Sequence, residues 1–138
     1  MKRRMFINII TLLVVSGLTG CNSLQGRGEA ELSDVSILNQ QEQTKELELQ
    51  VKWDGELAYN EIHEVPPNKD EEKIWVIRNE WPSETGSFIV RARIDGDEEW
   101  ETREYPLEDR EGSCYSIIVR IRENGKIDIP SSTSEEPC

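Results

Sequence analysis

Apolar and polar residues alternate with a period of two along much of the chain. In residues 47–53 leucine, valine and tryptophan occupy every second position, and residues 88–94 and 115–121 repeat the pattern. On a strand such positions share one face, whereas on a helix they would scatter around the axis. The pattern therefore predicts strands, even at residues 44–52, which contain good helix formers.

Shorter apolar segments complete a set of seven or eight predicted strands. They include a weak strand around Val35 and Ile37 and segments near residues 57–65, 74–77, 100–105 and 127–129. Glycine, proline, asparagine and aspartate separate these segments at fairly regular spacing. Many short strands with such turns are typical of a two-sheet sandwich. We therefore expect an all-β fold, an immunoglobulin-like sandwich of seven to eight antiparallel strands in one domain.

The last hairpin has a turn whose length decides its register. A two-residue turn at Asn124-Gly125 would place arginines beside isoleucines, because one residue of shift exchanges the two faces of a strand. A three-residue loop over residues 123–125, with Gly125 in the left-handed conformation, pairs Ile127 with Ile121 instead. We expect the second arrangement because it gathers the isoleucines on one face.

Loop length also decides the register of the preceding hairpin. A three-residue loop over residues 95–97 would set Trp100 opposite Ala92, a large ring over a small side chain. Such a pair fills a core well. A two-residue loop would set Glu99 there, so we expect the longer loop.

The first twenty residues have the three-part pattern of a signal peptide. Lys2, Arg3 and Arg4 are followed by an apolar run over residues 5–15 and by mostly small residues at 16–20. The run is shorter than the roughly 20 residues that span a bilayer. Arg3-Arg4 before bulky apolar residues also resembles a twin-arginine export signal, so both the Tat and the Sec route stay open.

Leu18-Thr19-Gly20-Cys21 resembles the lipobox of prokaryotic lipoproteins, in which the cysteine receives the lipid. The alternative is an ordinary cleaved signal peptide followed by a chance cysteine. A stable hold on a membrane takes two acyl chains, each contributing about 0.8 kcal/mol per buried methylene. We expect Cys21 to be lipidated and residues 21–30 to form a flexible tether, so that the domain sits on the outer face of the cell membrane.

The exported part is strongly acidic. The chain has 16 lysines and arginines against 28 aspartates and glutamates, and three of the basic residues lie in the first twenty. Thirteen basic residues thus face 28 acidic ones in the remainder, a formal charge of −15. This charge argues against nucleic acid as a partner and against electrostatic binding to anionic lipid. A hydrated surface is the simpler interpretation, and an acidic surface for a cationic partner is the alternative.

Two of the three cysteines remain once Cys21 is assigned to the lipid. Outside the cytoplasm disulfides persist, so Cys114 and Cys138 are expected to pair. The register of the last hairpin sets Cys114 across from Ser134, four residues before Cys138. The bridge would clamp a tail of residues 131–138 to a domain of residues 31–130, and loop closure suggests roughly 3 kcal/mol of stabilisation.

Residues for catalysis are hard to assemble. His63 is the one histidine and is expected to be solvated, and the sequence has no G-x-S-x-G, C-x-x-C or H-x-x-x-H pattern. We expect neither an enzyme nor a cofactor nor a metal centre. Two weaker hypotheses are calcium at the acidic turn of residues 95–98 and a ligand stacked on Trp81, whereas Trp53, Trp75 and Trp100 follow strand patterns and are expected in the core.

The lipobox at Leu18 to Cys21, the strand pattern from Gly86 onward, Cys114 opening the penultimate strand and Cys138 at the C-terminus together resemble a group of small uncharacterised secreted lipoproteins of archaea, of the haloarchaeal type. The resemblance implies location and an immunoglobulin-like domain, and no activity. The leading hypothesis is a non-catalytic, lipid-anchored envelope module that meets an envelope protein partner. The alternative is a solute- or ion-binding module, and a third class, an envelope hydrolase, would need a cleft of convergent polar groups.

Overall fold

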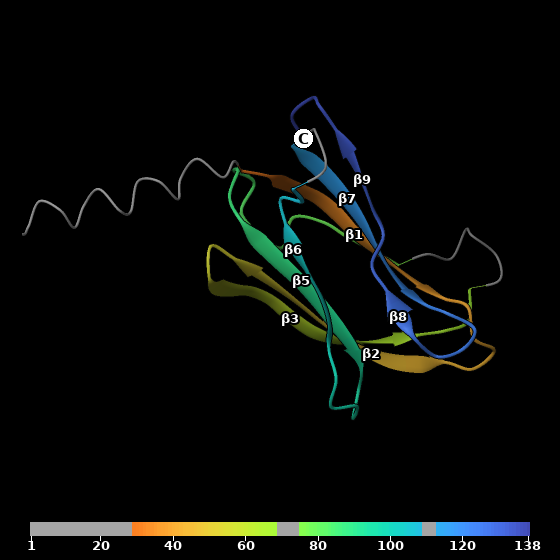
Figure 1. The fold of residues 1–138 in the computed structure, drawn as a ribbon. Helices are drawn as coiled ribbons and strands as arrows, with labels where there is room; N and C mark the ends of the chain where they lie inside the picture. Colours follow the sequence, from red (N-terminus) through yellow and green to blue (C-terminus); the bar gives the residue numbers. More distant parts are fainter. Residues whose placement is uncertain (1–28, 69–74, 109–112) are drawn as a thin grey trace, which may run out of the picture.

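The computed structural model describes residues 29–68, 75–108 and 113–138. Within them every regular element is a strand, and nine strands form two facing sheets (Figure 1). The predicted all-β sandwich is confirmed, with nine described strands in place of the expected seven or eight. The additional element is a short strand over residues 131–134, near the C-terminus.

One sheet holds four antiparallel strands in the order β3-β2-β5-β6. Their bounds are β2 Lys45–Trp53, β3 Glu56–Val65, β5 Phe88–Ile94 and β6 Glu101–Tyr105. Every second residue of β2 and most alternate residues of β5 are buried, as the period of two predicts. Strand β3 lies at the edge of this sheet, and most of its residues are exposed.

The other sheet has the order β4-β1-β7-β8, and β9 also pairs with β7. The bounds are β1 Glu31–Asn39, β4 Trp75–Ile77, β7 Cys114–Ile121, β8 Ile127–Asp128 and β9 Ser131–Ser134. Strand β8 pairs with the end of β7 and β9 with its beginning. The predicted C-terminal tail therefore begins as a strand of the sheet.

Strand β1 is longer and more central than the weak strand predicted there, and it runs parallel to β7. The sequence analysis expected antiparallel strands throughout, and this parallel pair is the exception. Because no hairpin joins β1 to β7, no turn fixes their relative direction. An irregularity between Leu32 and Asp34 shifts the register. It brings Leu32 and Val35, three residues apart, to the same buried face.

The core between the sheets has an aromatic cluster around Phe88. The Phe88 ring stacks on Trp53 and on Tyr105, each with ring centroids 4.9 Å apart, and meets the edge of Tyr115 at 6.0 Å. Aliphatic residues continue the core toward the other end of the sandwich. They are Val35, Ile37, Leu47, Leu49, Val51, Val90, Ala92, Ile117, Val119 and Ile121, none more than 1% exposed.

The predicted register of the last hairpin is confirmed. Ile121 pairs with Ile127, and the amide of Gly125 donates to the carbonyl of Arg122 at 2.9 Å. Gly125 has a φ of 87°, which lies in the left-handed region that glycine adopts without steric cost. The same register continues into β9, where Cys114 pairs with Ser134 as expected.

The predicted register of the β5–β6 hairpin is wrong by one residue. Ala92 pairs with Glu101, so Trp100 does not lie opposite Ala92. Trp100 is half-buried, and the guanidinium carbons of Arg91 and Arg93 lie 4.0 and 4.3 Å from its ring centroid. Cation–π contacts with the two arginines stabilise the Trp100 ring outside the core. This contact competes with the packing of Trp100 over Ala92, on which the predicted register depended.

Different segments of the chain meet at the two ends of the sandwich. At one end the chain enters β1, and Ala30 exchanges two backbone hydrogen bonds with Gly86 at 2.8 and 2.9 Å. At the other end lie Asn39, Ile121 and the beginning of β2. The nine residues of β1 separate these ends by about 30 Å. We call them the entry end and the distal end.

Candidate functional site

The residues predicted to direct export and anchoring lie outside the described residues. They are Arg3, Arg4, Leu18, Thr19, Gly20 and Cys21. In the described part of the chain no helix is long and apolar enough to cross a membrane. The export signal and the lipid at Cys21 therefore stay predictions.

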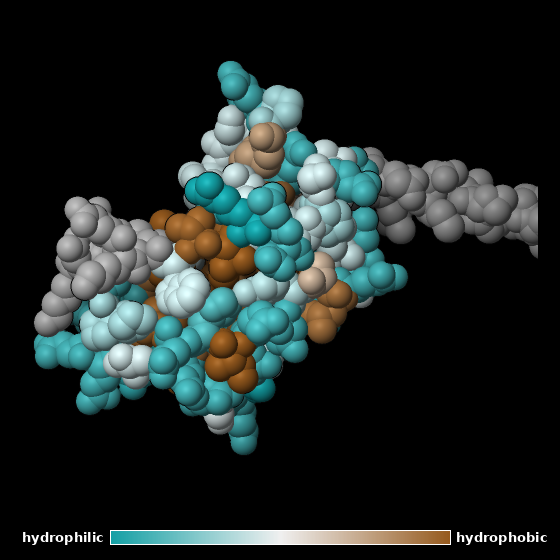
Figure 2. Space-filling model, turned by 180° about the vertical axis from the view of Figure 1, so that it is seen from behind, coloured by the Kyte–Doolittle hydropathy of each residue, from teal (hydrophilic) through white to brown (hydrophobic). Residues whose placement is uncertain are grey.

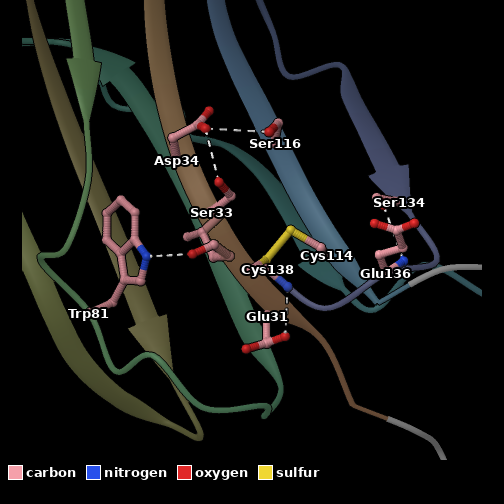
Figure 3. Close-up of a disulfide and its surroundings, with 10 residues drawn as sticks. Glu31, Ser33, Asp34, Trp81, Cys114, Ser116, Ser134, Glu136 and Cys138 are labelled. Carbon is pink, nitrogen blue, oxygen red and sulfur yellow. Dashed lines mark hydrogen bonds between the residues drawn. A yellow bond between two sulfur atoms is a disulfide. The ribbon is translucent and has the colours of Figure 1, made fainter.

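The predicted disulfide is present. Cys114 and Cys138 are joined by an S–S bond of 2.03 Å, with their Cα atoms 5.1 Å apart (Figure 3). Cys114 opens β7, and the strand pairing with β9 brings the tail back toward it. The amide of Glu136 donates to the Ser134 hydroxyl at 3.1 Å, which turns the chain after β9. The bridge thus fastens the C-terminus to the sheet.

The disulfide lies at the entry end. Glu31, the first residue of β1, pairs with Cys114, and a carboxylate oxygen of Glu31 accepts a hydrogen bond from the Cys138 amide at 3.2 Å (Figure 3). The beginning of β1 and the C-terminal tail are therefore held together at the entry end.

Trp81 lies in the core, which corrects its prediction as an exposed stacking ring. It is 8% exposed, and its indole N–H donates to the carbonyl of Leu32 at 2.9 Å (Figure 3). Buried tryptophans usually satisfy that N–H in this way. The expectation of a core position holds for Trp53, at 6% exposure, and is wrong for Trp75, at 44%.

His63 is half-buried in an aromatic cluster, which corrects the expectation of a solvated side chain. Its Nε2 is hydrogen-bonded to the Tyr59 hydroxyl at 2.7 Å, and its ring lies 5.4 Å from that of Trp75. Tyr59 also meets the edge of Trp81 at 6.1 Å. Strands β3 and β4 are edges of different sheets, and this cluster closes the side of the sandwich between them.

The cluster shifts the pKa of both titratable rings, His63 and Tyr59. Burial lowers the pKa of His63 below 6.5, and the carboxylate of Glu61 opposes that shift. Burial raises the pKa of Tyr59 to about 12, and the negative charges of Glu61 and Glu80 add to the effect. His63 is consequently neutral at neutral pH, and Tyr59 stays protonated.

We expect the free energy of unfolding to fall as the pH is lowered from about 7.5 to about 5.5, and less so in His63→Gln. The unfolded chain takes up a proton near pH 6.5, whereas the folded chain resists it. The contribution of His63 is thus present above pH 6.5 and lost as the pH falls through its lowered pKa. Urea unfolding at stepped pH measures this slope, and equal slopes in the two proteins would contradict the assignment.

The acidic turn of residues 95–98 shows no grouping for calcium. The Asp97 amide donates to the Ile94 carbonyl at 2.9 Å, and Arg93 donates to the Asp97 carbonyl at 3.0 Å. Among the described residues no three side chains of histidine, cysteine, aspartate or glutamate come together in a way that could hold a metal. The hydrogen bond from Arg93 occupies the Asp97 carbonyl oxygen, which would otherwise be free to bind a calcium ion.

A polar hollow of about 720 Å³ lies at the distal end. We call it the distal hollow, and its described lining consists of Gln40, Gln41, Glu42, Gln43, Lys45, Asn68 and Glu123. It joins the β1–β2 loop to the loop after β3 and to the β7–β8 turn. Sequence reasoning overlooked it, although the run Gln40-Gln41-Glu42-Gln43 was a visible signal of an amide-rich loop.

Asn39 organises the wall of the distal hollow. Its side chain is fully buried, and its Nδ2 donates to the carbonyls of Gln43 at 2.8 Å and Val65 at 2.9 Å. Its Oδ1 accepts from the Gln41 amide at 2.9 Å, and its carbonyl accepts from the Asn68 amide at 2.7 Å. One satisfied amide therefore holds the β1–β2 loop against the loop that follows β3.

Polar side chains cover much of the face that Figure 2 shows. Figure 2 shows brown apolar side chains in several areas that teal polar side chains separate. The exposed large apolar residues of the described chain are Leu57, Ile62, Trp75, Val76 and Ile118. Neither a protein-family model nor a curated protein sequence matches this chain.

Proposed function

We propose that this chain is a lipid-anchored, extracytoplasmic module of the cell envelope with a non-catalytic role, exported by Tat or Sec and held through Cys21. Its domain is proposed to be immunoglobulin-like, which the facing sheets and the regularly spaced turns support. The partner would be an envelope protein or a ligand, and not nucleic acid, given the charge of −12 on the whole chain.

The observation that carries this proposal is the opposite placement of the disulfide and the distal hollow. The bridge Cys114–Cys138 reinforces the entry end, next to the predicted tether. The distal hollow opens about 30 Å away, beyond the far end of β1. A domain anchored at Cys21 would therefore present the hollow away from the membrane.

Replacing Cys21 with serine is expected to release the protein from the membrane fraction, since serine cannot carry the thioether-linked lipid. Fractionation of cells followed by mass spectrometry of the N-terminal peptide measures both consequences. The matched control is Cys114→Ser/Cys138→Ser, which removes the other two thiols and should leave anchoring intact. A Cys21→Ser protein that stays membrane-bound like the parent would refute the anchor.

A solute-binding module is the second candidate function, and the distal hollow favours it. The routes foreseen for such binding, an exposed Trp81 and an acidic calcium turn, lose support from the buried position of Trp81 and the hydrogen bonds of the turn. A hollow of this volume lies within the range of small-molecule sites, about 300–1,000 Å³. It also places polar groups from three loops around one space.

A further inference from the structure

We propose that the distal hollow binds a neutral oligosaccharide through the side-chain amides that line it. This inference deepens the solute-binding candidate and rests on it, and it does not depend on whether Cys21 carries a lipid. It names the ligand class, the hydroxyl-rich carbohydrates, and assigns Asn68 as the central contact.

The side-chain amide of Asn68 is buried and has no hydrogen-bond partner among the described residues. The residue is 8% exposed, and among the described residues neither its Nδ2 nor its Oδ1 has a hydrogen-bond partner. A buried polar group left in this state is costly, and most such groups in native proteins are paired. Asn68 also lines the distal hollow. Both polar atoms of the amide are closed off from solvent, so a ligand would reach them once the Asn68 side chain turns toward the hollow. A ligand that both donates and accepts hydrogen bonds would then satisfy the amide.

The chemistry of the lining selects among ligand classes. All seven described lining residues are polar, so an apolar ligand would desolvate amides without replacing their hydrogen bonds. Two carboxylates, on Glu42 and Glu123, outnumber the single ammonium of Lys45, which disfavours phosphorylated or other anionic ligands. The described lining thus favours a neutral polar ligand.

A hydroxylated ligand fits this lining better than a peptide. Four lining residues, Gln40, Gln41, Gln43 and Asn68, offer side-chain amides that each donate and accept, as each sugar hydroxyl also does. Peptide recognition usually depends on large side chains anchored in apolar pockets. The described lining supplies no apolar pocket for such an anchor.

The wall is held before any ligand arrives. The Asn39 side chain fixes the β1–β2 loop through two hydrogen bonds and ties it to the end of β3 through a third. The Gln41 side chain donates to the Glu123 carbonyl at 3.2 Å. The Gln40 amide donates to the Ile121 carbonyl at 2.8 Å. Groups fixed in this way lose less entropy on binding, which favours affinity.

The test uses the full-length protein in buffer free of sugar-headgroup detergents, because these would compete for the site. Four neutral trisaccharides, maltotriose, cellotriose, mannotriose and N,N′,N″-triacetylchitotriose, are titrated by calorimetry and by saturation-transfer NMR. We expect at least one to bind with a Kd below about 1 mM. Asn68→Leu should weaken that binding by roughly tenfold or more, while Asn60→Ala, an exposed amide on β3, should leave it unchanged.

Unfolding measurements keep the result interpretable. Asn68→Leu removes an unpaired buried amide, so it should not lower the urea midpoint, and lost binding would then reflect the site and not misfolding. Binding should also survive a rise in salt from about 0.05 to about 0.5 M, because the ligand is neutral. No binding by any of the four sugars, or binding that Asn68→Leu leaves intact, would overturn the inference. Failure of sugar binding would not contradict the proposed lipid anchor, because the Cys21→Ser experiment tests the anchor separately.

Discussion

Replacing Phe88 with alanine is expected to lower the free energy of unfolding by about 4 kcal/mol. Phe88 is 1% exposed and lies between the rings of Trp53 and Tyr105, with centroids 4.9 Å from each. Its removal would empty the centre of the aromatic cluster and break three ring contacts, each contributing about 0.5–1.5 kcal/mol beyond burial. Urea unfolding followed by tryptophan fluorescence measures the loss, because Trp53 lies in the same cluster.

The control for this prediction is Ile118→Ala. Ile118 is also an apolar strand residue, but it is 39% exposed on the outer face of its sheet. We expect its truncation to cost less than about 1 kcal/mol. If the two variants unfold at the same urea concentration, the aromatic cluster is not the centre of the core.

Replacing Cys138 with serine is expected to lower the free energy of unfolding by about 3 kcal/mol under oxidising conditions. The bridge joins residues separated by 24 positions, and its removal frees the unfolded chain to adopt extended loops. It would also release the end of β9, whose four residues pair with the beginning of β7. Chemical unfolding of the two proteins without reductant measures the difference.

Reductant provides the matched comparison. The parent protein in dithiothreitol should unfold at the same urea concentration as Cys138→Ser, because both then lack the bridge. Hydrogen exchange should be faster in residues 131–134 of the variant than in the parent. Equal stability of the oxidised parent and the variant would show that β9 holds the tail without the bridge.

The candidate site could be predicted in part. The pairing of Cys114 with Cys138 followed from the number of cysteines and from a hairpin register that Gly125 dictates, both of which are local in the sequence. The environment of His63 could not be predicted, because Tyr59 precedes it on β3 while Trp75 reaches it from another sheet. The distal hollow likewise depends on Asn68 lying near Gln41, which requires the loops to meet.

Tryptophan positions show the limit of the periodic pattern. Trp75 occupies an inward position of β4, but β4 is a three-residue edge strand, so its ring remains 44% exposed. Trp81 lies in a loop without periodicity, yet its indole reaches the Leu32 carbonyl inside the core. Periodicity reports which face a residue takes, whereas burial depends on what covers that face.

The sequence by itself determined the class of the fold, most strands and one hairpin register, because alternation and turn glycines act over a few residues. Tertiary structure alone decided the parallel pairing of β1 with β7, the outward position of Trp100 against Arg91 and Arg93, and the gathering of amides at the distal end. These features join segments far apart in the chain or shift a register by one residue. They follow from the balance of packing, cation–π contact and hydrogen bonding in the folded protein, which no local pattern contains.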